Sequence, residues 1–132
     1  MATRLYRVVK TADETVTNTT TKQDDDSLTF SPPVSSKVVV DGFLIFSSSA
    51  VADIAFDWTL PTGATMDWAI EGETDATLDG AGVGTERTVS FRGSVVMSST
   101  AGAVTLKWAQ GTAEATNTTV HAGSALTAVA YT

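Results

Sequence analysis

Residues 37–46 read KVVVDGFLIF, and this stretch decides the fold class because apolar side chains occupy both of its alternating sets of positions. One set consists of Val38, Val40, Leu44 and Phe46, and the other consists of Val39, Phe43 and Ile45. Successive side chains of a β-strand point to opposite faces, so both faces of this strand need cover. In a small β-protein such a strand is either central to the fold or part of a subunit interface.

The remaining apolar segments alternate with a period of two, which is the pattern of half-buried strands. In AVTLKWAQ (103–110), for example, Val104, Leu106 and Trp108 share one face. Turn-forming residues separate these runs, and no segment keeps a helical period for three turns. We therefore predict an all-β fold, an antiparallel β-sandwich of the jelly-roll type with about eight to ten strands. The expected strands lie near residues 5–10, 15–21, 27–30, 36–48, 52–59, 65–71, 86–98, 102–109, 115–121 and 124–131.

The last expected strand, within SALTAVAYT (124–132), also carries apolar residues on both faces. Leu126 points one way, whereas Val129 and Tyr131 point the other way, with small alanines between them. Two strands of this kind and no helix to cover them favour a homo-oligomer.

Length and composition exclude several classes of function. A chain of 132 residues can bury a core as one domain, expected at residues 11–132 after a short arm at residues 1–10. The absence of cysteine excludes thiol catalysis and cysteine-type zinc sites. The sequence shows neither the apolar run of a signal peptide nor a membrane span, so we expect synthesis in the cytoplasm and no membrane partner. A net charge of −7 should repel nucleic acid.

Basic residues are concentrated in the expected arm. Arg4, Arg7 and Lys10 all precede Asp13, the first acidic residue of the chain. A basic segment on an acidic body can dock against an acidic surface, and the plainer alternative is a short segment that happens to be basic.

Two short motifs suggest ligands but are better explained by local structure. GAGVG (80–84) is glycine-rich, yet it lacks a following Lys-Ser or Lys-Thr and the G-x-G-x-x-G spacing, so we interpret it as a hairpin tip. DDD (24–26) offers carboxylates that suit calcium, but consecutive residues of an extended chain point to opposite sides and cannot all reach one ion. We expect these aspartates to accept hydrogen bonds from backbone donors at the following turn, and we expect no metal and no cofactor.

His121 is the only histidine in the chain. A Ser-His-Asp triad is possible because serines and aspartates are available, but no G-x-S-x-G elbow is present, so we predict a solvated histidine and no enzyme.

Trp58, Trp68 and Trp108 could form a platform for stacking saccharides. Each lies on the apolar face of its segment, which favours packing in the core.

Three segments resemble a module of tailed-bacteriophage virion proteins found in head decoration proteins, head fibres and tail-fibre or minor tail proteins. They are KTADETVTNTTTKQDDDSLTFS (10–31), VVVDGFLIFSSSAVADIAFDWTLPTGA (38–64) and VSFRGSVVMSSTAGAVTLKWAQGTAEATNTTVHAGSALTAVAY (89–131). The most specific positions are Gly102, Val104, Leu106, Trp108, Ala109, Gln110, Gly123, Ser124 and Leu126.

The resemblance implies a jelly roll similar to tumour-necrosis-factor-like trimers, which acts by binding rather than by catalysis. The expected function is a bacteriophage capsid decoration (cement) protein, a homotrimer on the capsid exterior of the virion, because here the module stands alone behind a short arm. The trimer interface is expected at Val39, Phe43, Ile45, Val129 and Tyr131. The arm is expected to bind the major capsid protein of the phage head through Arg4, Leu5, Tyr6, Arg7, Val8 and Lys10.

The alternative within the same resemblance is a tail-fibre or receptor-binding adhesion module. Such a module would contact a host-surface saccharide through GAGVG (80–84) and neighbouring loop tips.

Overall fold

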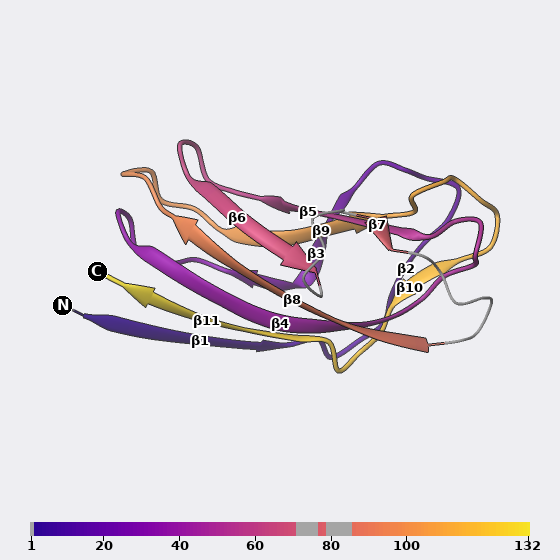
Figure 1. The fold of residues 1–132 in the computed structure, drawn as a ribbon, viewed down its shortest axis with the longest axis horizontal. Helices are drawn as coiled ribbons and strands as arrows, with labels where there is room; N and C mark the ends of the chain where they lie inside the picture. The colour runs from indigo at the N-terminus through magenta and orange to yellow at the C-terminus, as the bar shows by residue number, and fades with distance from the viewer. Residues whose placement is uncertain (1, 71–76, 79–85) are drawn as a thin grey trace.

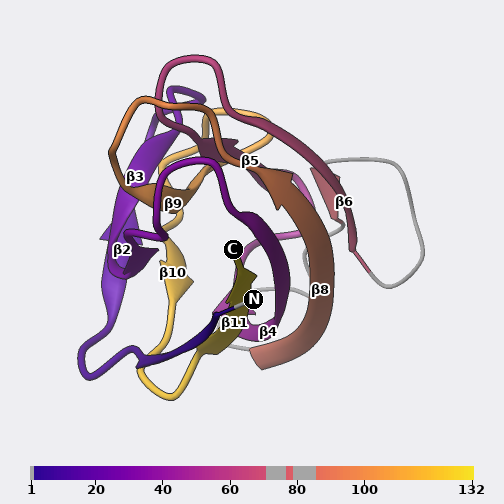
Figure 2. The ribbon, with the colours of Figure 1, turned by 90° about the vertical axis from the view of Figure 1, so that its left-hand side faces the viewer.

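The fold is a sandwich of two antiparallel sheets, seen in a computed structural model that describes residues 2–70, 77–78 and 86–132. Figure 1 shows the two layers along their length, and Figure 2 shows them from one end. The larger sheet contains β1 (Thr3–Val9), β2 (Glu14–Val16), β4 (Lys37–Ser47), β6 (Thr65–Ile70), β8 (Glu86–Val96), β10 (Thr118–Val120) and β11 (Ala125–Tyr131). The smaller sheet contains β3 (Gln23–Phe30), β5 (Ile54–Thr59), β7 (Thr77–Leu78) and β9 (Val104–Ala109).

The predicted fold class is confirmed, and each of the ten expected strand ranges overlaps an observed strand. The expected strand at 15–21 is shorter because Asn18 adopts a left-handed conformation with φ of 52°, which ends the extended run after Val16. The additional strand β7 has only two residues, too few for an alternating pattern to reveal it.

Strand β4 is the centre of the larger sheet, which is one of the two alternatives that its two apolar faces suggested. It pairs with β8 along its whole length. Its other edge pairs first with β11, from Lys37 to Phe43, and then with β10 at Phe46 and Ser47. The strand therefore holds together both halves of this sheet (Figure 1).

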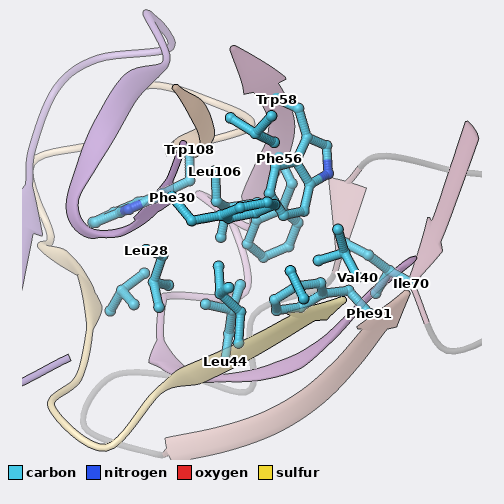
Figure 3. Close-up of a cluster of buried hydrophobic side chains, with 14 of the residues drawn as sticks. Leu28, Phe30, Val40, Leu44, Phe56, Trp58, Ile70, Phe91, Leu106 and Trp108 are labelled. Carbon is cyan, nitrogen blue, oxygen red and sulfur yellow. The ribbon is translucent and has the colours of Figure 1, made fainter. Parts of the chain in front are cut away.

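The core lies between the two sheets and uses the inward positions that alternation predicted. Val38, Val40, Leu44 and Phe46 of β4 are buried, as are Val104, Leu106 and Trp108 of β9. Aromatic rings meet between the sheets: the Phe46 and Phe56 centroids are 6.4 Å apart. The centroids of Trp58 and Phe91, both labelled in Figure 3, are 5.6 Å apart. The core role of the tryptophans is confirmed for Trp58 and Trp108, whereas Trp68 is partly buried at the margin of the core.

Gly42 allows the close packing of β4 against its neighbours. A Cβ atom at this position would lie 2.4 Å from the Phe91 ring and 2.5 Å from the carbonyl oxygen of Ala125. Because any side chain would collide with both, only glycine lets Phe91 pack beneath the middle of the strand.

A buried ion pair joins the beginning of the chain to the smaller sheet. Lys10 and Asp25 are each 2% exposed, and Lys10 Nζ lies 3.0 Å from Asp25 Oδ2. Asp25 also accepts hydrogen bonds from the backbone N–H groups of Ser27 and Leu28, both at 2.9 Å, and from Trp108 Nε1 at 3.0 Å. The prediction that an aspartate of DDD satisfies local backbone donors is therefore confirmed for Asp25.

Glu14 completes this cluster at its partly exposed side. Its Oε1 accepts a hydrogen bond from Lys10 Nζ at 2.8 Å and another from the Asp26 backbone N–H at 3.1 Å. Burial by itself would lower the pKa of Lys10, but the hydrogen bonds and negative charges of Glu14 and Asp25 outweigh it and raise that pKa above its ordinary 10.5. Lys10 is therefore charged in the folded protein at neutral pH.

The expected boundary between an arm at residues 1–10 and the rest of the chain does not appear in the structure. Residues Thr3–Val9 form β1, which pairs with β11 over seven consecutive residues, and Lys10 is buried. Val8 and Tyr6 face inward and pack against the core, and Tyr6 Oη donates to the Ser31 carbonyl oxygen at 3.0 Å. Each alternating set of this segment contains apolar side chains, Tyr6 and Val8 in one and Leu5 and Val9 in the other, as expected of a strand.

We expect Asp25→Asn to destabilise the protein by ~3–5 kcal/mol, because it leaves the buried Lys10 ammonium with only Glu14 as a counter-charge. Asp26→Asn is the matched control: Asp26 is exposed, and its replacement should change stability by less than ~0.5 kcal/mol. Urea unfolding at pH 7 measures both. Equal stability of the two variants would show that the ion pair contributes nothing.

The Lys10–Asp25 pair also predicts that the free energy of unfolding depends on pH in the alkaline range. Because the pKa of Lys10 is raised on folding, its stabilising contribution is complete below the ordinary 10.5 and is lost as pH rises through the folded-state value. The difference in unfolding free energy between wild type and Lys10→Met should therefore narrow only above about pH 10.5.

Candidate functional site: an exposed apolar face on the larger sheet

The larger sheet turns one face away from the core, and the strand register sorts its side chains into rows. One row runs Leu5, Val129 and Val39 across β1, β11 and β4, because Leu5 pairs with Val129 and Val129 pairs with Val39. A parallel row on the same face contains Val9, Ala125 and Phe43. Apolar side chains thus lie side by side on three neighbouring strands, facing away from the smaller sheet.

The structure brings the five residues of the expected trimer interface onto this one face. Val39, Phe43 and Tyr131 are exposed at 46%, 37% and 41%, and Val129 is half-buried between them. Ile45 is on the same face two residues beyond Phe43 on β4 and is partly buried, and the His121 backbone N–H donates to its carbonyl oxygen at 2.8 Å. We call the set Leu5, Val39, Phe43, Val129 and Tyr131 the apolar patch.

The six residues expected to bind a capsid divide into two groups because β1 is a strand. Leu5 and Arg7 share the outward face with the apolar patch, and Leu5 is 52% exposed. Tyr6, Val8 and Lys10 face the interior. Arg4 is exposed on the same side of the strand as Tyr6, with its guanidinium 5.7 Å from the Tyr6 ring centroid.

A shallow groove of about 560 Å³ borders the patch on the side of β8 and β6. Its lining includes Val39, Asp41, Asp67, Trp68, Ala69 and Arg92. The Arg92 guanidinium donates to Asp41 Oδ1 through Nε and Nη2, both at 3.1 Å. Asp67 lies on the same row as Val39, because Asp67 pairs with Ser94 and Ser94 pairs with Val39.

A hydrogen-bonded cluster surrounds His121 at the far end of β4. Its Nε2 lies 2.9 Å from Ser47 Oγ, and its Nδ1 lies 3.3 Å from Asp13 Oδ2. Glu86 Oε1 is 3.9 Å from Nε2. The prediction of a solvated histidine is wrong, since this side chain is 19% exposed and bridges three segments of the chain.

The order Ser47, His121, Asp13 is that of a catalytic triad, but its setting is structural. Ser47 is the last residue of β4 and is paired with both β8 and β10, rather than lying on a sharp turn that projects a nucleophile. The Ala122 backbone N–H donates to Asp13 Oδ1 at 2.8 Å, and this bond together with His121 lowers the pKa of Asp13 below its ordinary 3.8. The cluster therefore fastens the β1–β2 connection to the ends of β4 and β10.

Other candidate sites can be compared with the described part of the chain. GAGVG (80–84) lies outside the described residues. Among the residues that the structure describes, no group of three or more potential ligands is placed to hold a metal ion. Within those same residues, no helix has the length and apolar character needed to cross a membrane.

Sequence reasoning missed two features of this face. Leu5 belongs to the apolar patch rather than to a separate arm, and the alternation of Leu5, Arg7 and Val9 was the available signal. The acidic rim of the groove, from Asp41 on β4 and Asp67 on β6, depends on the pairing of both strands with β8, and no local pattern reports that pairing.

Comparison of the sequence with protein families and with curated proteins finds no match. Similar solved structures include the tripod (BppUct-A-L) from the baseplate of bacteriophage Tuc2009, with a TM-score of 0.45 and 11% identity over 90% of this chain and 62% of that chain. A second is infectious bursal disease virus, Gx strain, with a TM-score of 0.33 and 14% identity over 98% of this chain and 41% of that chain. A third is the VP2 subviral particle of infectious bursal disease virus, with a TM-score of 0.33 and 14% identity over 98% of this chain and 42% of that chain.

This chain spans less than two thirds of the length of each of these structures. TM-scores below 0.5 do not establish a common architecture, so a function for this chain has to come from its own residues and geometry.

Proposed function

We propose that this chain is a structural protein of a bacteriophage virion, a decoration protein that binds the outer surface of the capsid as a homotrimer. The observation that carries the proposal is the apolar patch. Leu5, Val129 and Val39 adjoin one another across three strands, and contiguous exposed apolar side chains of this kind mark a protein–protein interface, whereas isolated ones do not. A module that acts by association needs such a face and needs no catalytic constellation.

The resemblance to tailed-phage virion modules supports the viral setting, and the structure supplies a face where copies can meet. Decoration proteins sit on a lattice with three-fold and quasi-three-fold axes, which match the symmetry of a trimer. Binding the capsid then requires a second surface that the trimer contact leaves free. Arg4 suits this role because it projects from the side of β1 opposite to Leu5 and Arg7.

We expect Val39→Asp to dissociate the trimer, because it places three carboxylates into a contact that excludes water. The wild-type assembly should have a mass of about 41 kDa, three times the 13.7 kDa of one chain, and the variant a mass of one chain. Val51→Asp is the matched control: Val51 is 63% exposed on the β4–β5 connection, outside the patch, and its replacement should leave the trimer intact. Sedimentation velocity distinguishes the two outcomes, and an unchanged mass for Val39→Asp would refute the interface.

Immunogold labelling of virions with antibody against this chain tests the proposed location. Gold spread over the head is the expected result. Gold confined to the tail tip would reject decoration and favour the receptor-binding alternative, with a host-surface saccharide as its ligand. An absence of label on virions that contain the chain by mass would place it inside the particle and reject both.

We expect Arg4→Glu to weaken binding of the trimer to particles assembled without this chain by about tenfold or more. One exposed charge contributes ~0.2–1 kcal/mol, and three copies in a trimer act together. Lys22→Glu makes the same change of charge outside β1 and serves as the control. Co-sedimentation with particles at low and physiological salt measures the effect, which should be larger at low salt. Equal binding of the two variants would remove Arg4 from the contact.

A further inference from the structure

The larger sheet ends in two long strands that have a neighbour on one side only. In the described part of the chain, β1 pairs with β11 alone and β6 pairs with β8 alone. An edge strand presents unpaired backbone groups and readily accepts another chain. These two edges differ in sequence and in charge, so they offer two different surfaces for association.

The edge at β1 is apolar and basic. Leu5 and Val9 are 52% and 59% exposed, and Arg7 lies between them on the same outward face. Among the described residues Arg7 has no ion-pair or hydrogen-bond partner. The strand therefore carries two exposed apolar side chains that flank an uncompensated positive charge.

The edge at β6 complements it in both respects. The groove that reaches this strand spans the sheet from β4 across β8 to β6, and its lining includes the apolar Val39 and Ala69 as well as Asp67. Asp67 is likewise without a partner in the described part of the chain, whereas Asp41 already pairs with Arg92. The groove thus offers apolar surface next to an uncompensated negative charge.

The two surfaces cannot meet within one subunit. The row from Leu5 through Val129, Val39 and Ser94 to Asp67 crosses five strands. At 4.7–4.9 Å per strand, the β1 edge and the β6 edge are separated by about 19 Å. Any pairing of Arg7 with Asp67 therefore has to join different copies of the chain.

We propose that β1 of one subunit lies in the groove beside β6 of the next subunit, with Arg7 against Asp67 and Leu5 against Ala69. This inference rests on the proposed homotrimer and specifies how it is built. A contact between two different surfaces is heterologous and closes into a ring when the rotation between copies suits the number of subunits. It also covers the exposed side chains of Leu5 and Arg7 on β1 with surface from a second copy.

Mixing two variants tests the arrangement. Leu5→Asp damages only the β1 surface, and Ala69→Asp damages only the groove, so each variant alone should have the mass of one chain. An equimolar mixture of the two variants still contains one unmodified β1 surface and one unmodified groove, because β1 of the Ala69→Asp chain can enter the groove of the Leu5→Asp chain. The mixture should form a dimer of about 27 kDa, twice the 13.7 kDa of one chain, and no trimer.

Two outcomes would overturn the inference alone, and a third would reject it together with the proposed function. If Ala69→Asp keeps the wild-type mass, the groove is not used. If both variants are monomers that fold, by circular dichroism and thermal melting, and their mixture forms no dimer, the contact is not head to tail. A wild-type chain that sediments as a monomer would instead reject the trimer itself, and this inference with it.

A charge exchange provides a second test that does not depend on the apolar variants. Arg7→Asp alone should weaken association about tenfold or more, and Arg7→Asp combined with Asp67→Arg in the same chain should restore it, because every contact of the ring then contains the reversed pair. Arg4→Glu, on the opposite side of the same strand, should leave the trimer unchanged. Failure of the double variant to recover, with its fold intact, would reject the Arg7–Asp67 contact.

Discussion

The buried carboxylate of Asp25 is the constraint on which the arrangement of the chain's first thirty residues depends. It is held by Lys10, by two backbone N–H groups and by Trp108 of β9, so one side chain connects the end of β1, the start of β3 and the middle of the smaller sheet. Removing Lys10 would leave the buried Asp25 carboxylate without a counter-charge. The first strand is consequently part of the sandwich and not an appendage.

This attachment determines what the N-terminal strand can offer to a partner. Once Lys10 is fixed, alternation along β1 sends Tyr6 and Val8 inward and Leu5 and Arg7 outward. The outward pair then joins Val129 and Val39 in one row through the register with β11 and β4. A basic segment that suggested a free anchor is instead a rigid edge, and its two sides can serve different contacts.

Local alternation was sufficient to predict the fold class, the strands and the buried face of β4, because each depends on residues two positions apart. The features that failed to emerge depend on distant pairs. Lys10 and Asp25 are 15 residues apart, and from the sequence alone two such charged residues are expected at the surface. His121 meets Ser47 across 74 residues and Asp13 across 108, so a lone polar ring gave no sign of its partners. The register between β1, β11 and β4, which creates the apolar patch, likewise cannot be predicted from local sequence without knowing the order of the strands in the sheet.

The two edges of the larger sheet connect this architecture to assembly. The described residues contain no helix that covers these edges, and exposed edge strands are commonly protected by charged side chains or by pairing with another chain. Charge alone does not suffice at β1, where Leu5 and Val9 remain more than half exposed. The proposed contact, in which β1 lies in the groove of a second copy, would cover Leu5 and Arg7. Because β1 and β6 differ in sequence and sign of charge, that association has a direction, and a directed contact can close a ring around a three-fold axis.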